Sequence, residues 1–206
     1  MKKQIAIFFI VSLFLLSTSV YAATGLFSED WESGEINQAY WNSTGTNQYR
    51  TFVNDAHPSG GGNFALQMDD SVDDSTYSGN FVYTKPIFGK DNQGNPMNPE
   101  TLEIAFNWSH ANDEFQACLN IFGSLGYGDC LVLSCSNSPV SWKKLQDLNP
   151  SFPTDTWKAE HLTVNLDAVC GNVPHSNILV GFRHYDNFGI YQDGFFIDKI
   201  FFLWYT

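Results

Sequence analysis

The fold is decided by the closing stretch of the chain, which reads YDNFGIYQDGFFIDKIFFLWYT over Tyr185–Thr206. Asp193-Gly194 predicts a turn, because glycine accepts a positive φ and aspartate tolerates it. Nearly every residue of Phe195–Trp204 is aromatic or aliphatic, which favours a strand and is too short for a membrane helix. A strand that is apolar on both faces lies in a sheet whose faces are at least partly covered. We therefore expect the last central strand of a sandwich.

One carboxylate interrupts this strand. Asp198 stands among apolar residues, and a buried carboxylate is costly unless a cation or a cluster of donors receives it. Lys199 is a poor partner, because adjacent residues on a strand point to opposite faces. Asp198 therefore indicates a bound cation, with Arg183 or backbone donors as the alternative.

The other end of the chain predicts export. Two lysines precede a largely apolar run over residues 5–16, and Val20-Tyr21-Ala22 follows as a small-x-Ala cleavage signal. The apolar run falls short of the ~20 residues that a membrane span needs. We expect residues 1–22 to be a secretory signal peptide and residues 23–206 to form a single secreted domain, extracellular or, in a bacterium, periplasmic or at the cell surface.

The chain is acidic, with a formal net charge of −12 at pH 7. A polyanion repels nucleic acid and anionic lipid, whereas scattered carboxylates suit cation binding. We expect neither a nucleic-acid partner nor membrane insertion. The oligomeric state is not indicated.

Four cysteines in an exported chain predict two disulfides. The sequence leaves the three possible pairings open. We favour Cys118–Cys130, which would close a glycine-rich segment over 123–128, and Cys135–Cys170, which would tie distant strands. A zinc site is the alternative, but the chain has no CxxC and no histidine at a matching spacing.

Short apolar segments with turn signals between them predict about ten strands and no long helix. The expected strands are Gly25–Asp30, Gln48–Asn54, Phe64–Met68, Asn80–Ile87, Leu102–Trp108, Phe115–Ile121, Cys130–Ser134, Ser141–Leu145, Lys158–Leu166, Asn177–His184 and Gly194–Trp204. Such a pattern is typical of an all-β sandwich or barrel.

The order of several motifs resembles a group of extracellular jelly rolls that includes the reelin repeats, the MAM domains and the bacterial choice-of-anchor modules. The motifs are Phe27–Gly34 followed by Trp41, then Ser59–Leu66, Val82–Ile87, Leu102–Trp108, Asp129–Ser134 with Ser141-Trp142, Phe182–Tyr185 and Asp193–Ile200. One departure is the run Cys135–Trp142, which lacks the Asp-box residues that reelin-type repeats often carry there. The resemblance implies a jelly-roll β-sandwich of two antiparallel sheets, in which Trp31, Trp108 and Trp142 are buried.

The resemblance also implies a structural Ca²⁺ between the first and the last strand. Calcium takes six to eight oxygen ligands from carboxylates, carbonyls and water. The expected ligands are Glu29 and Asp30 from the first strand, Asp70 after the strand over 64–68, and Asp198, with Glu32 and Asp69 beside them. The alternative is that Glu29 and Asp70 are solvated turn acids.

A mixture of rings, amides and acids joins the last two expected strands. Flat rings cover the apolar face of a sugar, and acid and amide groups bind its hydroxyls. We therefore expect Tyr185, Asp186, Asn187 and Tyr191 to bind a ligand. The alternative is that this loop only closes the sandwich.

The sequence carries no catalytic signature. HExxH, G-x-S-x-G and P-loop patterns are absent, and Glu103 and Glu114 lack the partner acid at strand spacing that marks many glucanases. We expect a secreted non-catalytic recognition or adhesion module that binds an extracellular glycan or protein surface. The alternatives are a glycan-active hydrolase, which needs two carboxyl groups, and a structural self-associating protein with an exposed apolar patch on the last strand.

Overall fold

The computed structural model of the chain describes residues 24–47, 49–70, 78–111, 115–118, 120–121, 124–125, 128–136, 141–186 and 194–206. The expected leader over residues 1–22 lies outside this part, so it stays a prediction. The strands are β1 (Thr24–Glu29), β2 (Trp41–Thr46), β3 (Tyr49–Asn54), β4 (Ala65–Asp70), β5 (Ser78–Thr84), β6 (Thr101–His110), β7 (Asn120–Ile121), β8 (Ser124–Leu125), β9 (Cys130–Ser134), β10 (Trp142–Asp147), β11 (Lys158–Asn165), β12 (Leu179–Asp186) and β13 (Phe195–Tyr205). The helices are α2 (Leu166–Cys170) and the 3₁₀ turn η1 (His175–Asn177).

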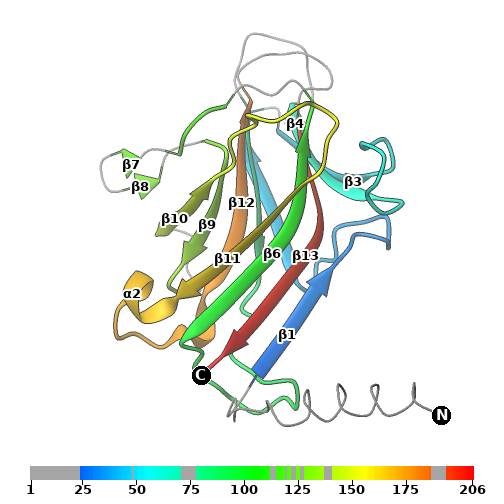
Figure 1. Cartoon of the computed structure of the whole chain (residues 1–206). Coiled ribbons are helices and arrows are strands. Elements are labelled where there is room, and N and C mark those ends of the chain that lie inside the picture. Colours follow the sequence, from blue (N-terminus) through cyan, green and yellow to red (C-terminus); the bar gives the residue numbers. More distant parts are fainter. Residues whose placement is uncertain are drawn as a thin grey trace, which may run out of the picture.

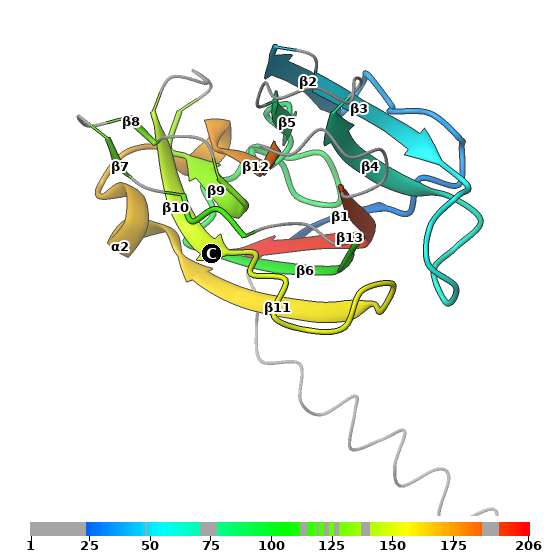
Figure 2. The same ribbon diagram turned by 90° about the horizontal axis from the view of Figure 1, so that it is seen from above.

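Two antiparallel sheets lie face to face (Figures 1 and 2). In the described part of the chain, the six-stranded sheet has the order β11-β6-β13-β4-β3 with β1 also paired to β13, and the five-stranded sheet has the order β10-β9-β12-β5-β2. β13 pairs along β6 on one side, and on the other side first with β4 and then with β1. The predicted all-β sandwich with a central last strand is confirmed.

Aromatic side chains join the two sheets across the core. Phe106 of β6 and Phe182 of β12 meet edge to face, with ring centroids 5.0 Å apart. Trp41 of β2 lies 6.3 Å from Phe202 of β13. These four rings are at least 98% buried. In β6 the alternate residues from Leu102 to Trp108 are buried, as the period-two pattern predicts.

The burial of β13 changes half-way along the strand. Phe195–Asp198 are buried, and beyond them buried and more exposed residues alternate. The change coincides with a shift in the register against β6, where Lys199 has a φ of 52°. A bulge of this kind turns the following side chains relative to the preceding ones. Both faces of β13 are therefore covered before the bulge, as expected, whereas beyond it Phe201 is 38% exposed.

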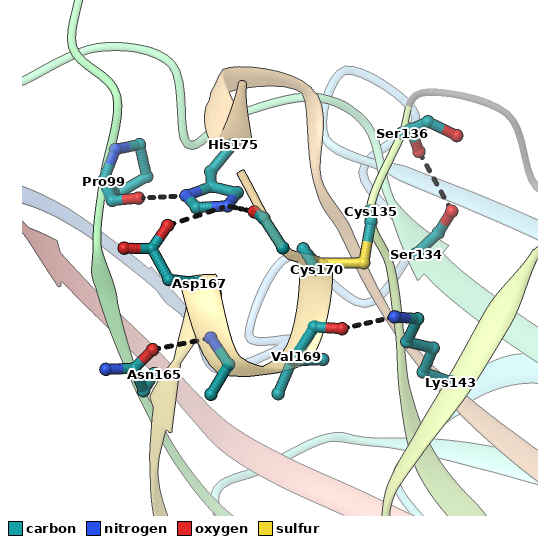
Figure 3. Close-up of a disulfide and its surroundings, with 12 residues drawn as sticks. Pro99, Ser134, Cys135, Ser136, Lys143, Asn165, Asp167, Val169, Cys170 and His175 are labelled. Atoms are coloured by element: carbon teal, nitrogen blue, oxygen red, sulfur yellow. Dashed lines mark hydrogen bonds and ion pairs between the residues drawn. A yellow bond between two sulfur atoms is a disulfide. The ribbon is translucent and has the colours of Figure 1, made fainter. Parts of the chain in front are cut away.

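A disulfide fastens α2 to the sandwich. Cys170 at the end of the helix is bonded to Cys135 after β9, and Lys143 donates to the carbonyl of Val169 beside the bond (Figure 3). The side chain of Asn165 accepts a hydrogen bond from the N–H of Ala168 and so caps the helix. A helix of five residues is too short to be stable by itself, so these contacts hold it.

Several details of the expected strands differ from the structure; the expected strand Asn80–Ile87, for example, is β5 over Ser78–Thr84. β2 was not expected, because WNSTGT has one large apolar residue and no alternation. Residues 115–118 are not in a strand, so the expected strand over 115–121 is wrong in that part. Leu166 starts α2 instead of ending the preceding strand. None of the helices in the described ranges has the length and hydropathy to cross a membrane.

Candidate functional site

The outer face of the five-stranded sheet, which is turned away from the core between the sheets, is the most distinctive surface. Strand residues alternate between the two faces, and Val82, Val180 and Phe182 belong to the main core. The neighbours of these core residues therefore point outward, and so do the residues paired with those neighbours. The outer face thus carries Asn42 and Thr44 of β2, Phe81 and Tyr83 of β5, Gly181 and Arg183 of β12, Val132 of β9, and Trp142 and Lys144 of β10. A second, smaller apolar cluster forms here.

Three aromatic rings form the centre of this face. The rings of Phe81 and Tyr83 lie side by side, with centroids 4.9 Å apart and a tilt of 30°. Trp142 meets both rings edge to face, at 4.7 Å and 5.6 Å. Trp142 is only 7% exposed, whereas the other two rings are half-buried. Trp142 therefore supports the pair, and Phe81 and Tyr83 present ring surface to solvent.

Glycine at position 181 makes room for this arrangement. It lies opposite Tyr83 on one side and Val132 on the other. A Cβ atom at this position would lie 2.7 Å from Cε2 of Phe81, which is too close for real contacts. The ring of Phe81 therefore lies over the backbone of β12, as a strand glycine at a close approach permits.

The first disulfide lies at the border of the aromatic cluster. Cys118 and Cys130 are bonded and almost completely buried, and both belong to the second apolar cluster. The bond closes the segment that contains the β7–β8 hairpin. Both disulfides have the pairing that the sequence analysis favours. No cysteine is free, so none is left to ligate zinc.

A hollow of about 170 Å³ adjoins the aromatic cluster. Its lining residues are Thr44, Gly45, Thr46, Gly79, Asn80, Phe81 and Arg183. The guanidinium of Arg183 lies over the ring of Phe81, 4.7 Å from its centroid. The hollow therefore combines a ring, hydroxyl groups and a cation.

The expected ligand loop lies largely outside the described residues. Asn187 and Tyr191 are in the undescribed range, and only the backbone of Asp186 is described, opposite Ser78. Tyr185 lies opposite Gly79, and its N–H donates to Oδ1 of Asp129 at 2.9 Å. Gly79 also lines the hollow, so Tyr185 connects the expected loop with the outer face.

Of the expected calcium ligands, those from the first strand have other partners. Oε1 of Glu29 accepts from the N–H of Trp31 at 3.1 Å, and Oε2 accepts from Nε1 of Trp41 at 3.1 Å. Oδ1 of Asp30 accepts from the N–H of Glu32 in a local turn. The backbone of Asp70 pairs with Tyr49, and its side chain is outside the described part.

Asp198 instead accepts a hydrogen bond from the short segment that also binds Glu32. Gly62 donates its N–H to Oδ2 of Asp198 at 3.1 Å, and the next residue, Asn63, donates its N–H to Oε1 of Glu32 at 2.6 Å. An ideal Cβ at Gly62 would lie 2.0 Å from Oε1 of Glu32, so a larger residue at this position would displace the carboxylate of Glu32. The segment before β4 thus connects the opening and closing parts of the chain.

A turn after β1 places Glu32 at this position. Trp31 has a φ of 59°, in the left-handed region that non-glycine residues rarely adopt. Its side chain is completely buried in the core, and its carbonyl accepts from Gly34. Burial of the indole holds the turn, which directs Glu32 towards the segment before β4.

The two carboxylates have different electrostatic surroundings. Burial raises the pKa of Asp198, although hydrogen bonds from Gly62 and Lys199 oppose the shift. Hydrogen bonds from the side chain and backbone of Asn63 lower the pKa of the exposed Glu32. In the described ranges neither carboxylate forms an ion pair, and no group of three metal-ligating acids, histidines or cysteines occurs.

The acids considered for catalysis are only partly described. Glu103 lies on β6, accepts from the hydroxyl of Tyr205 at 3.2 Å, and is 3.4 Å from Nε2 of His161. Its alternation places it away from the core, as expected. Glu114 lies outside the described residues, so the pair is not tested.

Sequence reasoning missed the outer face because it looked for ligand-binding rings in loops. The alternation of side chains between the two faces of the strand SGNFVYT could have indicated this face, since it places Phe81 and Tyr83 opposite Val82. Trp142 is buried as expected, but in the outer cluster and not between the sheets. Pairing of the strands brings these rings together with Arg183, and no pattern within a single segment predicts this pairing.

No family model and no curated protein matches the chain, so the resemblance to reelin repeats and MAM domains stays a prediction. The chain is similar to the enzymatically active domain of bacteriophage CBA120 tailspike protein 4, with a TM-score of 0.45 and 9% identity over 84% of this chain and 20% of that chain. It is also similar to the K1 cleaved adhesin domain of Lys-gingipain from Porphyromonas gingivalis, with a TM-score of 0.47 and 13% identity over 86% of this chain and 96% of that chain. A third similar structure is CBM27-1 from Caldicellulosiruptor saccharolyticus in complex with mannohexaose, with a TM-score of 0.48 and 12% identity over 86% of this chain and 96% of that chain. The chain thus spans a fifth of the tailspike domain. At these identities and scores, the similarities identify neither a family nor a ligand.

Proposed function

We propose that the chain is a non-catalytic module that binds extracellular glycans on the outer face of the five-stranded sheet. One observation carries the proposal: Phe81 and Tyr83 present adjacent, half-buried rings beside a hollow with hydroxyl groups and a guanidinium. Aromatic faces cover the apolar face of a pyranose, and nearby polar groups bind its hydroxyls. Trp142 packs against both rings, and this packing limits the side-chain entropy that they lose on binding.

The test is binding to an array of soluble polysaccharides, followed by titration calorimetry on each glycan that is bound. We expect Tyr83→Ala to weaken binding about tenfold, because one ring contact contributes up to ~1.5 kcal/mol beyond its buried area. Phe201→Ala is the control, because it removes an exposed ring from the other sheet. Binding to no glycan, or equal binding by both variants, contradicts the proposal.

We also propose a structural Ca²⁺ held by Asp198 and Glu32. The two carboxylates accept from consecutive backbone N–H groups and have no ion pair among the described residues, and a cation bound to both would neutralise their negative charge. Backbone carbonyls and water would complete the oxygen ligands that calcium takes. The ion would neutralise the buried carboxylate and fasten β13 to the turn after β1. Asp70 remains a candidate ligand, whereas the hydrogen bonds of Glu29 argue against its taking part.

Thermal unfolding in EDTA and in CaCl₂ tests this site. We expect calcium to raise the Tm of the wild-type protein, since a ligand at 100 times its Kd stabilises the native state by about 2.7 kcal/mol. Asp198→Asn should abolish the effect, and Glu32→Gln should reduce it. Glu100→Gln, an exposed acid elsewhere, should keep it. A calcium shift that persists in Asp198→Asn would place the ion elsewhere.

Export is proposed on two grounds. Both disulfides are formed, and disulfides persist mainly in oxidising compartments. The opening residues also have the composition of a secretory leader. N-terminal sequencing of the protein recovered from the medium or periplasm should begin at Ala23. An N-terminus at Met1 there would contradict cleavage.

A second candidate function is self-association through the six-stranded sheet. Leu26 of β1 and Phe201 of β13 are 49% and 38% exposed, and both lie on the face away from the core. Leu26 pairs with Leu203 in the register, so the patch continues across two strands. Sedimentation of the wild type and of Phe201→Lys tests it: a dimer that the substitution dissociates supports this candidate, and a monomeric wild type excludes it.

A further inference from the structure

The two disulfides differ in their access to solvent. Cys118 is only 2% exposed and Cys130 is completely buried, so their bond lies within the second apolar cluster. Cys135 and Cys170 are both half-buried, and their bond connects the residue after β9 with the end of α2 (Figure 3). Because thiol–disulfide exchange requires direct attack on a sulfur atom, access determines which of the two bonds can react.

A groove of about 420 Å³ lies over the second bond. Its described lining residues are Cys135, Ser136, Ser141, Cys170, Val173, Pro174 and Asn177. Apart from the two cysteines, each of these residues is exposed, and Val173 is 42% exposed. The groove therefore leads from solvent to the disulfide and offers an apolar contact at its rim.

The charges around this bond favour exchange. The described lining contains no acid, although the chain has 22. Lys143 donates to the carbonyl of Val169, the residue before Cys170, and so places an ammonium group beside the bond (Figure 3). Asp167, the acid within α2, faces His175 instead. Both the attacking and the leaving groups of the exchange are thiolates, and a nearby cation stabilises a thiolate.

Other contacts hold the segment around α2 when the bond is open. Asn165 caps the start of the helix. Beyond the helix, the ring nitrogens of the buried His175 lie 2.7 Å and 3.2 Å from the carbonyl oxygens of Pro99 and Gly171. None of these contacts involves a cysteine side chain. Reduction would therefore loosen one short helix and leave the two sheets intact.

We propose that this groove is the docking site of a dithiol oxidoreductase, which reduces Cys135–Cys170 and spares Cys118–Cys130. One thiolate of the partner attacks a sulfur of the bond, forms a mixed disulfide and displaces the other cysteine as a thiolate, which takes a proton from water. The partner's second thiolate then attacks the partner's own sulfur in the mixed disulfide and releases the remaining cysteine, which is protonated in the same way. The chain gains two electrons, and the partner is oxidised to a disulfide.

Reduction of the folded protein tests the selectivity. The protein is incubated with dithiothreitol, quenched at intervals, alkylated with iodoacetamide and digested for mass spectrometry. We expect Cys135 and Cys170 to be alkylated at least about tenfold faster than the other pair, because a buried bond reacts only when the structure opens. In concentrated urea the two bonds should react at similar rates. Equal rates in the folded protein, or earlier reaction of the buried bond, overturn the inference.

Reduction by a protein dithiol tests the docking. The probe is thioredoxin, recycled by its reductase and NADPH, and we expect it to act faster than dithiothreitol at equal thiol concentration. Val173→Asn should slow thioredoxin roughly threefold or more and leave dithiothreitol unchanged, because it removes an apolar contact from the rim without closing the groove. Leu26→Asn, which makes the same kind of change at an exposed residue of the other sheet, is the control and should leave both rates unchanged.

Thermal unfolding verifies that each variant is folded. A thioredoxin rate that Val173→Asn does not lower, or that is no faster than the dithiothreitol rate, overturns the docking. Hydrogen exchange of the reduced protein should increase in α2 and stay slow in β6 and β13. Loss of protection in the two strands would overturn the local effect of reduction. None of these outcomes depends on glycan binding, because the groove lies away from the rings of Phe81 and Tyr83.

Discussion

At the scale of the residue, two buried carboxylates have contrasting partners. Asp69 is paired with Arg50 and with the side-chain amide of Gln67. Among the described residues, Asp198 accepts only from two backbone N–H groups. The sequence indicated that Asp198 needs compensation, because the residues around it are apolar. It could not show that the compensating groups come from Gly62 and Lys199, since one of them is 136 positions away.

The raised pKa of Asp198 predicts a pH dependence of stability without calcium. Burial penalises the charged form, so the native state binds a proton more readily than the unfolded chain. The contribution of this group is most favourable below its unfolded pKa of ~3.9 and is lost as the pH rises through the folded pKa. In EDTA, the Tm of the wild type minus that of Asp198→Asn should increase as the pH falls from neutral. A difference that is independent of pH would contradict the prediction.

At the scale of the element, alternation predicted most strands, and their ends needed more information. β9 has the expected bounds, β3 differs by one residue at its start, and β1 and β6 differ by one or two residues at each end. β2 escaped notice because WNSTGT becomes a strand by pairing with β5, and not through its own propensity. α2 begins where Asn165 caps the next turn, a local signal that the apolar pattern concealed.

Removal of the second disulfide should destabilise the protein more than removal of the first. Cys135 and Cys170 are 35 positions apart, and Cys118 and Cys130 are 12 apart. Chain-entropy reasoning gives about 4 kcal/mol for the longer loop and about 3 kcal/mol for the shorter one. Urea unfolding of the two Ser–Ser double variants measures this. Hydrogen exchange of α2 should also increase when Cys170 is replaced, and an unchanged helix would show that its cap is sufficient.

At the scale of the whole molecule, charge opposes compactness. The chain has a formal net charge of −12, so its excess carboxylates repel one another, and salt screens this repulsion. We expect the Tm in EDTA to rise by roughly 2–4 °C between low and physiological NaCl, which corresponds to about 1 kcal/mol for a domain of this size. Choline chloride at equal ionic strength is the control for specific sodium binding. A Tm that falls with salt would mean that attractive ion pairs dominate.

The sequence by itself determined the all-β architecture, the central position of the last strand and the burial of Asp198, because alternation and apolar runs are local properties of the chain. The tertiary structure alone decided which groups surround that carboxylate and that Phe81, Tyr83, Trp142 and Arg183 share one face. Those neighbours come from strands distant in the sequence. Their meeting depends on the order and register of pairing, which no single segment encodes.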